Sequence, residues 1–438
     1  MSGSTTSSVI FRGLIGLAFA TAALRPGDVQ AATLPVSNCE DSGAGSLREA
    51  VATAMEGDTV DLSALECNPV ALTSGQIEVP QDNLEMIGRQ GITIDANRTG
   101  RVIHHSGTGT LCIDRLLLTN GLYVANFATG GCLHSDGNVE LVSSTVDSCQ
   151  ALGEGGTDPV ALGGGVYANT ALIRHSALSS NKAAGGAGHG GGISTVGRVT
   201  IFRSSVMFNE ASAGAGVSTL GGATVTYSSI SSNLARNNAG MEASGGSVTI
   251  NKSSFMSNEA QLRCGAICVL GTGRTSILDS TFSRNLATFL SVGALSDDAT
   301  ISNSTIAFNV EQSGNECTGT IRARQLRMQS TIAASNACVA SMQAYDVGGR
   351  PWEGYTLTGA NNLIGRSLVG VPADTISADP RLEVTPAFNG GPTFTHLLLS
   401  DSPAIDRGNN VFNRQYDQRG PGFPRVKGVR ADIGAVEF

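Results

Sequence analysis

The sequence predicts an all-β protein: a right-handed, single-stranded parallel β-helix (solenoid) of about 12 coils with a short N-terminal capping helix. Three observations predict this fold. A segment of about 25 residues repeats along most of the chain, its apolar residues keep fixed places, and no helix-length segment separates the short strands. Only 15% of the residues are charged and 56 are glycine, which suits short strands and tight turns.

The repeat is visible by direct superposition. Residues 199–209, 248–258 and 299–309 align without gaps, and each segment ends in asparagine. Buried amides that hydrogen-bond from one coil to the next explain such a column, so we interpret it as structural. The column begins at Asn120 and Cys149. From Asn181 onward it continues at intervals of 24 to 28 residues, through Asn209, Asn233, Asn258, Asn285, Asn309 and Asn336.

The apolar residues form two further columns. Both lie at fixed distances before the asparagine, and together they show the alternation of short strands, about three per coil. A chain that returns to the same inward residue after each repeat must stack its turns at the strand spacing of ~4.8 Å. The columns are Ile173, Ile201, Val225, Ile250, Ile277 and Ile301, and Leu178, Val206, Ile230, Phe255, Phe282 and Ile306.

The chain divides into four expected segments. Residues 1–31 have the pattern of a signal peptide, with Arg12 before an apolar run that is too short to span a bilayer. Residues 32–69 form an N-terminal cap, in which Ser46 and Glu49 start a short helix as a capping box. Residues 70–375 form the parallel β-helix, and residues 376–438 close it.

Nine cysteines suit an oxidising compartment. Their positions relative to the repeat suggest four disulfides. Cys112 falls at an apolar position that we expect to point inward, and we expect it to be a free thiol. The four expected pairs are Cys39 with Cys67, Cys132 with Cys149, Cys264 with Cys268, and Cys317 with Cys338.

Charge and hydropathy limit the partners. The formal net charge of −8 does not attract nucleic acid or anionic lipid, and no segment of the mature chain is long enough to span a membrane. No spacing of cysteine and histidine suggests zinc, and no dense group of aspartates suggests calcium. We therefore expect no cofactor, calcium being an unsupported alternative, in a monomeric protein that is secreted or displayed at a cell surface.

Several motifs resemble known families. Residues 38–51, followed by Gly57-Asp-Thr-Val60, resemble the cap of the bacterial secreted CSLREA-type β-helix proteins. Five ordered motifs, at 379–382, 389–396, 402–406, 417–420 and 431–437, resemble the choice-of-anchor Q domain. The tetrapeptides 255–258 and 282–285 are similar to repeats of polymorphic outer membrane proteins. The resemblance implies a bacterial, pectate-lyase-like solenoid without a settled activity.

One outward column carries the candidate site. The position six residues before each asparagine holds titratable groups on successive coils: His175, Arg203, Tyr227, Lys252 and Asp279. Removal of a proton beside a uronate carboxylate needs a base, a cation and an acid. Lys252 or Tyr227, Arg203, and His175 or Tyr227 suit these roles. The alternative is a solvated corner in which Lys252 and Asp279 form a weak exposed ion pair.

Two functions follow from this column. The first is a secreted or cell-surface protein that binds glycans or a surface partner along its ridged face. The second is a polysaccharide lyase or glycoside hydrolase that acts on an acidic polysaccharide with the outward column. The repeats leave room only for short loops, which favours binding, and a groove flanked by long loops would favour the enzyme.

Overall fold

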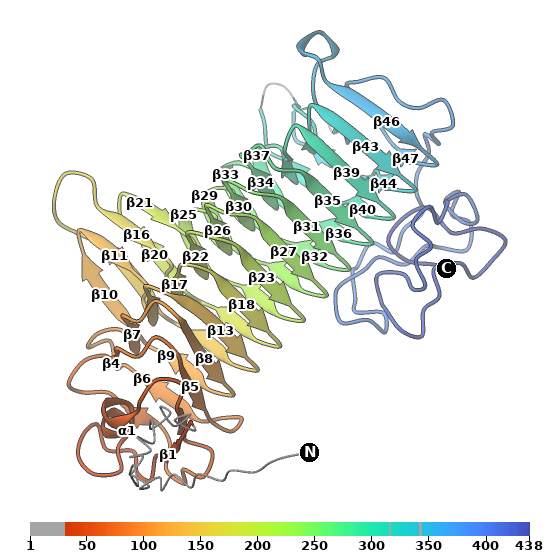
Figure 1. Ribbon diagram of the computed structural model, residues 1–438. Helices are drawn as coiled ribbons and strands as arrows, with labels where there is room; N and C mark the ends of the chain where they lie inside the picture. The colour runs from red at the N-terminus through yellow and green to blue at the C-terminus, as the bar shows by residue number, and fades with distance from the viewer. Residues whose placement is uncertain (1–30, 315–316, 341–343) are drawn as a thin grey trace, which may run out of the picture.

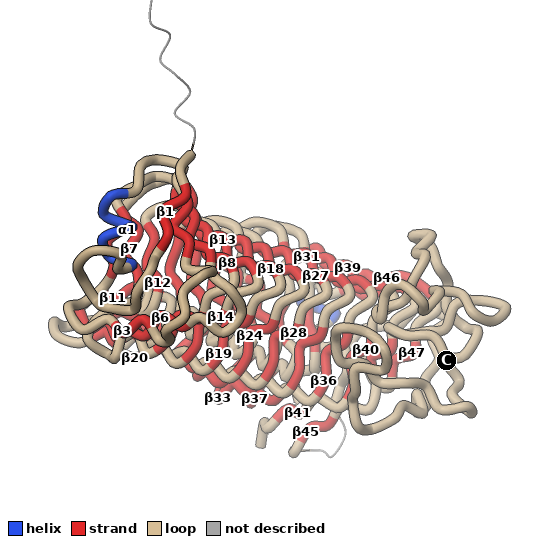
Figure 2. The backbone as a smooth tube through the Cα atoms, turned by 90° about the horizontal axis from the view of Figure 1, so that it is seen from below, coloured by secondary structure: helices blue, strands red, loops and turns tan. Residues whose placement is uncertain are grey.

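The computed structural model describes residues 31–314, 317–340 and 344–438. The expected signal peptide, 1–31, lies almost wholly outside the described residues. The described chain winds into a parallel β-solenoid, and its strands form four sheets of 13, 12, 12 and 10 strands that run along the axis (Figures 1 and 2). The predicted all-β parallel solenoid of about 12 turns is confirmed.

We name the sheets A to D. Sheet A consists of β1 (Thr33–Pro35), β2 (Thr59–Asp61), β5 (Leu84–Ile87), β8 (Thr110–Asp114), β13 (Asn138–Val142), β18 (Ala171–Arg174), β23 (Val199–Phe202), β27 (Ala223–Thr226), β31 (Val248–Asn251), β35 (Thr275–Leu278), β39 (Asp298–Ser302), β43 (Gln325–Gln329) and β46 (Thr356–Ala360). Sheet B consists of β3 (Val70–Ala71), β6 (Thr93–Asp95), β9 (Leu117–Thr119), β14 (Thr145–Asp147), β19 (Ala177–Ser179), β24 (Ser205–Met207), β28 (Ser229–Ser231), β32 (Ser254–Met256), β36 (Thr281–Ser283), β40 (Thr305–Ala307), β44 (Ile332–Ala333) and β47 (Leu363–Ile364).

Sheet C consists of β4 (Ile77–Val79), β7 (Ile103–His105), β12 (Leu133–Ser135), β17 (Val166–Ala168), β22 (Ile193–Thr195), β26 (Val217–Thr219), β30 (Met241–Ala243), β34 (Ile267–Val269), β38 (Gly293–Ala294) and β42 (Ile321–Arg322). Sheet D consists of β10 (Leu122–Ala125), β11 (Phe127–Thr129), β15 (Gln150–Gly153), β16 (Val160–Leu162), β20 (Lys182–Ala184), β21 (Ala187–His189), β25 (Glu210–Ala213), β29 (Leu234–Asn237), β33 (Glu259–Arg263), β37 (Leu286–Phe289), β41 (Val310–Glu311) and β45 (Ala337–Cys338). Helix α1 (Leu47–Thr53) and a 3-10 helix (Pro351–Glu353) complete the described elements.

The first coils, β2 to β4 and β5 to β7, visit sheets A, B and C. From β8 to β42 each coil visits the sheets in the order A, B, D, C, so it has four sides where the sequence suggested three strands. The fourth side was missed because sheet D has little room inside: its inward residues are alanines, which carry no strong apolar signal. The larger predicted columns do point inward. Ile201, Val225 and Ile250 are in register in sheet A, and the rings of Phe255 and Phe282 stack in sheet B with centroids 4.9 Å apart.

Two ladders of buried polar side chains support the corners. At the corner from B to D, the amide of each asparagine donates to Oδ1 of the next, as from Asn233 Nδ2 to Asn258 Oδ1 at 2.9 Å. Asn120 is not part of this column, because Gly121 holds the equivalent position. At the corner from A to B, serine hydroxyls accept from the backbone of the preceding coil, as Ser228 Oγ does from Ser204 N–H.

Stacking begins earlier in the chain than residue 70. Strand β1 pairs with β2, and β2 pairs with β5, so residues 33–35 and 59–61 already belong to sheet A. Helix α1 packs against β2 and β4 and buries Leu47, Ala50 and Val51. Its N-cap Ser46 accepts a hydrogen bond from Glu49 N–H, while the Glu49 carboxylate accepts from Gly45 N–H.

The last segment, 376–438, folds back along sheet B beside the final coils (Figures 1 and 2). Its contacts reach far back in the sequence. His396 Nε2 lies 2.8 Å from Ser283 Oγ on β36, and Ala435 N–H donates to Thr305 Oγ1 on β40. Arg425 is fully buried within the segment and pairs with Glu437 at 2.8 Å. The segment therefore covers one side of the solenoid.

Three expected disulfides are present: Cys39–Cys67, Cys132–Cys149 and Cys317–Cys338. The fourth expected pair, Cys264 and Cys268, is not among these disulfides. Both residues are buried, and their sulfur atoms lie 2.7 Å apart on either side of one corner. Cys112 is free, but it points outward, because Leu111 and Ile113 take the inward positions of β8.

Candidate functional site

The five residues of the predicted column occupy equivalent corners between sheets A and B. Each follows a strand of sheet A on consecutive coils, and each has a left-handed backbone, with φ between 44° and 52°. A corner of two residues requires this conformation, which L-residues other than glycine adopt at some cost. The column is therefore first of all a consequence of the turn. The residues are His175, Arg203, Tyr227, Lys252 and Asp279.

Lys252 and Asp279 are not exposed. The C-terminal segment covers both of them: Lys252 Nζ donates to the carbonyls of Tyr416, at 2.6 Å, and Asp417. Asp279 is 0% exposed and lies 3.6 Å from Lys252 and 3.3 Å from Arg414. The expected weak surface pair is thus a buried anchor for residues 376–438, which sequence alone could not show because those contacts span more than a hundred residues.

The other three residues line a cavity of about 720 Å³ between the corner and the C-terminal segment. His175 and Arg203 are exposed, and Tyr227 is half-buried. The opposite wall consists of Phe388, Pro392 and Phe394. Hydroxyl groups line much of the remainder, from Ser143, Thr145, Ser205, Ser229 and Ser231 among others.

The charge of this corner cavity differs from that of the chain as a whole. Among the described residues that line it, Arg203 is the only one with a permanent charge and none is a carboxylate. The Arg203 guanidinium lies 5.6 Å from the centroid of the Tyr227 ring. Burial raises the pKa of Tyr227, and the positive charge of Arg203 opposes that rise. Tyr227 is therefore a phenol at neutral pH.

A second group of titratable residues lies on the outer side of sheet C, and the sequence analysis missed it. Glu78, His104, His134 and Tyr167 are the central residues of β4, β7, β12 and β17, and they stand in register on consecutive coils. His104 Nδ1 lies 2.7 Å from Glu78 Oε2, and the ring of His134 stacks on Tyr167 at 5.2 Å. A search down the central residues of the three-residue strands would have found this row.

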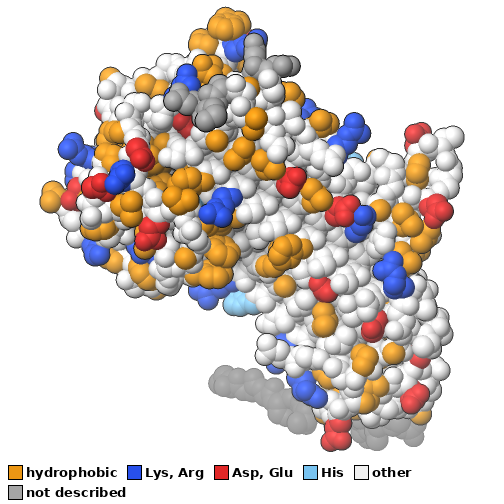
Figure 3. All heavy atoms as spheres, turned by 180° about the vertical axis from the view of Figure 1, so that it is seen from behind, with side chains coloured by type: hydrophobic (Ala, Val, Ile, Leu, Met, Phe, Trp, Pro, Cys, Tyr) orange, Lys and Arg blue, Asp and Glu red, His pale blue; other side chains and the backbone are white. Residues whose placement is uncertain are grey.

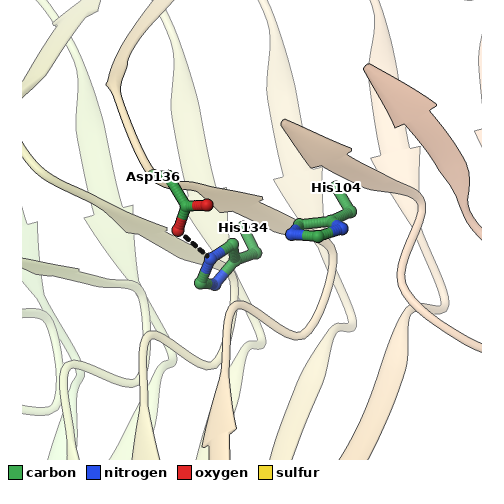
Figure 4. Close-up of side chains that lie close together, drawn as sticks. All are labelled: His104, His134 and Asp136. Atoms are coloured by element: carbon green, nitrogen blue, oxygen red, sulfur yellow. Dashed lines mark hydrogen bonds and ion pairs between the residues drawn. The ribbon is translucent and has the colours of Figure 1, made fainter. Parts of the chain in front are cut away.

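His134 lies between His104 and Asp136 (Figure 4). Its ring is 5.1 Å from that of His104, and its Nε2 is 3.0 Å from Asp136 Oδ1. Burial lowers the pKa of His134, while the nearby Asp136 raises it. Because burial dominates, the neutral imidazole is the main form at neutral pH, with a lone pair on one ring nitrogen.

Further along sheet C a smaller cavity of about 300 Å³ lies between sheets C and D. Its walls are largely apolar, and His189 Nδ1 and Glu242 Oε2 lie 3.6 Å apart in it. On the face shown in Figure 3, charged side chains of both signs are scattered among uncharged polar surface, and no broad area of one sign is present.

Comparisons with known proteins give little further guidance. No protein-family model matches the chain, and no curated protein matches it. A solved structure described as "Crystal structure of pectate lyase Pel9A" resembles it with a TM-score of 0.45 and 10% sequence identity, covering 94% of this chain and 97% of that chain. No helix in the described parts of the chain has the length and apolar character needed to cross a membrane.

Proposed function

We propose that this chain is an extracellular protein that binds an acidic polysaccharide in the corner cavity. The observation that carries the proposal is an accessible guanidinium, Arg203, in a cavity without carboxylates. Among the described residues no acidic side chain pairs with Arg203, so its fork of N–H donors is available to a uronate or sulfate group.

The remaining walls suit a sugar chain. A pyranose ring has apolar C–H faces and polar edges, and it packs its faces on aromatic rings while its hydroxyls form hydrogen bonds. Phe388 and Phe394 stack on each other at 4.3 Å on one wall, and Phe388 is 51% exposed. Serine hydroxyls form the opposite side. The volume of about 720 Å³ falls within the usual range for small-ligand sites, ~300–1,000 Å³.

Binding of polygalacturonate and of its fully methyl-esterified, uncharged form tests the proposal by titration calorimetry. We expect the acidic polymer to bind and the ester to bind at least tenfold more weakly. Arg203→Gln should weaken acidic binding by about 10- to 100-fold, the usual value of a charge-assisted hydrogen bond. Arg174→Gln is the matched control, because Arg174 is exposed and pairs with Glu140 outside the cavity. Equal affinity of Arg203→Gln and Arg174→Gln would refute the assignment.

The adjacency of His175, Arg203 and Tyr227 favours a second candidate, a polysaccharide lyase. Arg203 would neutralise the uronate carboxylate, and His175 and Tyr227 would exchange protons with the sugar. Lys252 takes no part in this scheme, because its ammonium is bound to main-chain carbonyls. Release of unsaturated uronate ends by the wild type, reduced about a hundredfold or more in Tyr227→Phe or His175→Gln, would support it. Undiminished release by both variants would exclude it.

Four finer features belong to the same proposal. The three disulfides fit an extracellular protein, and the pattern of residues 1–31 supports export by a signal peptide. The packing of α1 on β2 and β4 supports its role as a cap for the first coil. The ordered C-terminal motifs support membership of the choice-of-anchor Q group. A right-handed winding agrees with the general preference of parallel strand connections.

A further inference from the structure

We propose that His104, His134 and Asp136 bind one divalent transition-metal ion, with zinc as the expected ion, on the outer side of sheet C. One ligand atom from each residue lies within 4.8 Å of the other two. The site shares no residue with the corner cavity, so metal binding can be tested independently of polysaccharide binding.

The backbone holds the two histidines side by side. His104 and His134 are register partners in β7 and β12, so the parallel pairing itself brings the rings together on one face (Figure 4). Asp136 follows β12 directly, and its backbone N–H donates to His105 O at 2.9 Å, which holds the aspartate beside the rings. The ligand set therefore rests on regular secondary structure and one fixed turn.

The neighbours of the ligands have the arrangement of a second shell. Glu78 lies one coil before His104 and accepts a hydrogen bond from its Nδ1 at 2.7 Å. A carboxylate in this place holds the proton on Nδ1 and leaves the lone pair of Nε2 for a metal. The ligand atom of His134 is Nε2, the nitrogen that faces Asp136.

The donor set selects the class of ion. Two imidazoles and one carboxylate suit zinc and its first-row neighbours, whereas calcium and magnesium prefer six or more oxygen ligands. Ligand atoms around tetrahedral zinc are about 3.3 Å apart, and the 3.0 Å between His134 Nε2 and Asp136 Oδ1 is already close to this. Among the described residues, the negative charges of Glu78 and Asp136 outnumber the positive charge of neighbouring Arg101. Three protein ligands leave a fourth position for water or an incoming ligand.

Titration of the untagged, chelator-treated full chain with Zn²⁺ by calorimetry tests the proposal, and Co²⁺ absorption reports the ligands. We expect one Zn²⁺ per chain and a Co²⁺ spectrum of four-coordinate nitrogen and oxygen ligands. His104→Gln, His134→Gln and Asp136→Asn should each weaken Zn²⁺ binding by at least tenfold, and Glu78→Gln by about 10- to 100-fold.

His189→Gln is the matched control, since His189 lies elsewhere, beside Glu242, and should bind Zn²⁺ as the wild type does. Circular dichroism of each variant verifies the fold. Should His134→Gln prove unfolded, Asp136→Asn, an exposed position, decides the question. Zn²⁺ binding that is unchanged in folded His104→Gln and Asp136→Asn would overturn the proposal, as would a Co²⁺ spectrum dominated by thiolate charge transfer, which would place the ion at cysteine thiolates instead.

Discussion

Replacing Lys252 by methionine tests whether the C-terminal segment is anchored to the solenoid by a buried charge. The substitution keeps most of the aliphatic stem and removes the ammonium group, which donates to the carbonyls of Tyr416 and Asp417. It also leaves Asp279, which is 0% exposed, with Arg414 as its one remaining charged neighbour among the described residues.

The expected loss follows from that burial. Breaking a buried pair by removing one partner costs about 3–5 kcal/mol, because the other charge remains desolvated. An exposed pair contributes about 0–1 kcal/mol. Lys182→Met is the matched control, since Lys182 pairs with Glu210 at 2.7 Å and both side chains are more than 40% exposed. We therefore expect Lys252→Met to lose several times more free energy of unfolding than Lys182→Met.

Hydrogen exchange of the amides in 376–438 measures the local loss, and urea unfolding measures the global one. We expect exchange in this segment to rise by two orders of magnitude or more in Lys252→Met and to stay unchanged in Lys182→Met. The double variant Lys252→Met, Asp279→Asn should recover part of the protection, because it removes the stranded charge. Equal protection in both single variants would refute the buried anchor.

Three further predictions concern stability. Asn258→Ala removes four hydrogen bonds and orphans the buried N–H of Asn233, so we expect a loss of about 3–5 kcal/mol in urea unfolding. Burial lowers the pKa of His396 to about 4. The buried neutral ring of His396 therefore contributes at most about 3 kcal/mol to the free energy of unfolding. This contribution is complete above pH 6.5 and is lost as the pH falls to 4, which amide exchange in 376–438 would detect. Deleting 39–66 removes α1 and the inner strand β2, so light scattering should show aggregation.

Each of these predictions has its own control. Asn169 is exposed, and Asn169→Ala should change the free energy of unfolding by no more than about 0.5 kcal/mol; a similar loss in both variants would contradict the ladder's role. His396→Gln should lose less protection between pH 7 and pH 4 than the wild type does, and an equal loss in both proteins would assign it to another group. A monomeric and fully folded deletion variant would show that the first coil needs no cover.

How much of the site was predictable differs from residue to residue. The register of the corner column followed from the period alone, so His175, Arg203 and Tyr227 do share one corner and one cavity. Phe388 and Phe394 form the opposite wall of that cavity. They lie in the C-terminal segment, which has no repeat, so the period of the sequence does not predict where they lie. The histidine row was missed for another reason: its members lie on strands of three residues, which are too short for alternation to show which face they occupy.

The sequence by itself determined the repeating part of this protein: the parallel coils, the inward apolar columns, the asparagine ladder and three disulfides. In a solenoid each coil contacts only its neighbours, so the period in the sequence specifies the contacts in space. Tertiary structure alone decided what lies outside that one-dimensional rule. The C-terminal segment docks on coils more than a hundred residues away, and it buries Lys252 and Asp279 while leaving Arg203 open. The burial of Lys252 and Asp279 depends on contacts between residues that are far apart in the sequence, and no local sequence pattern predicts such contacts.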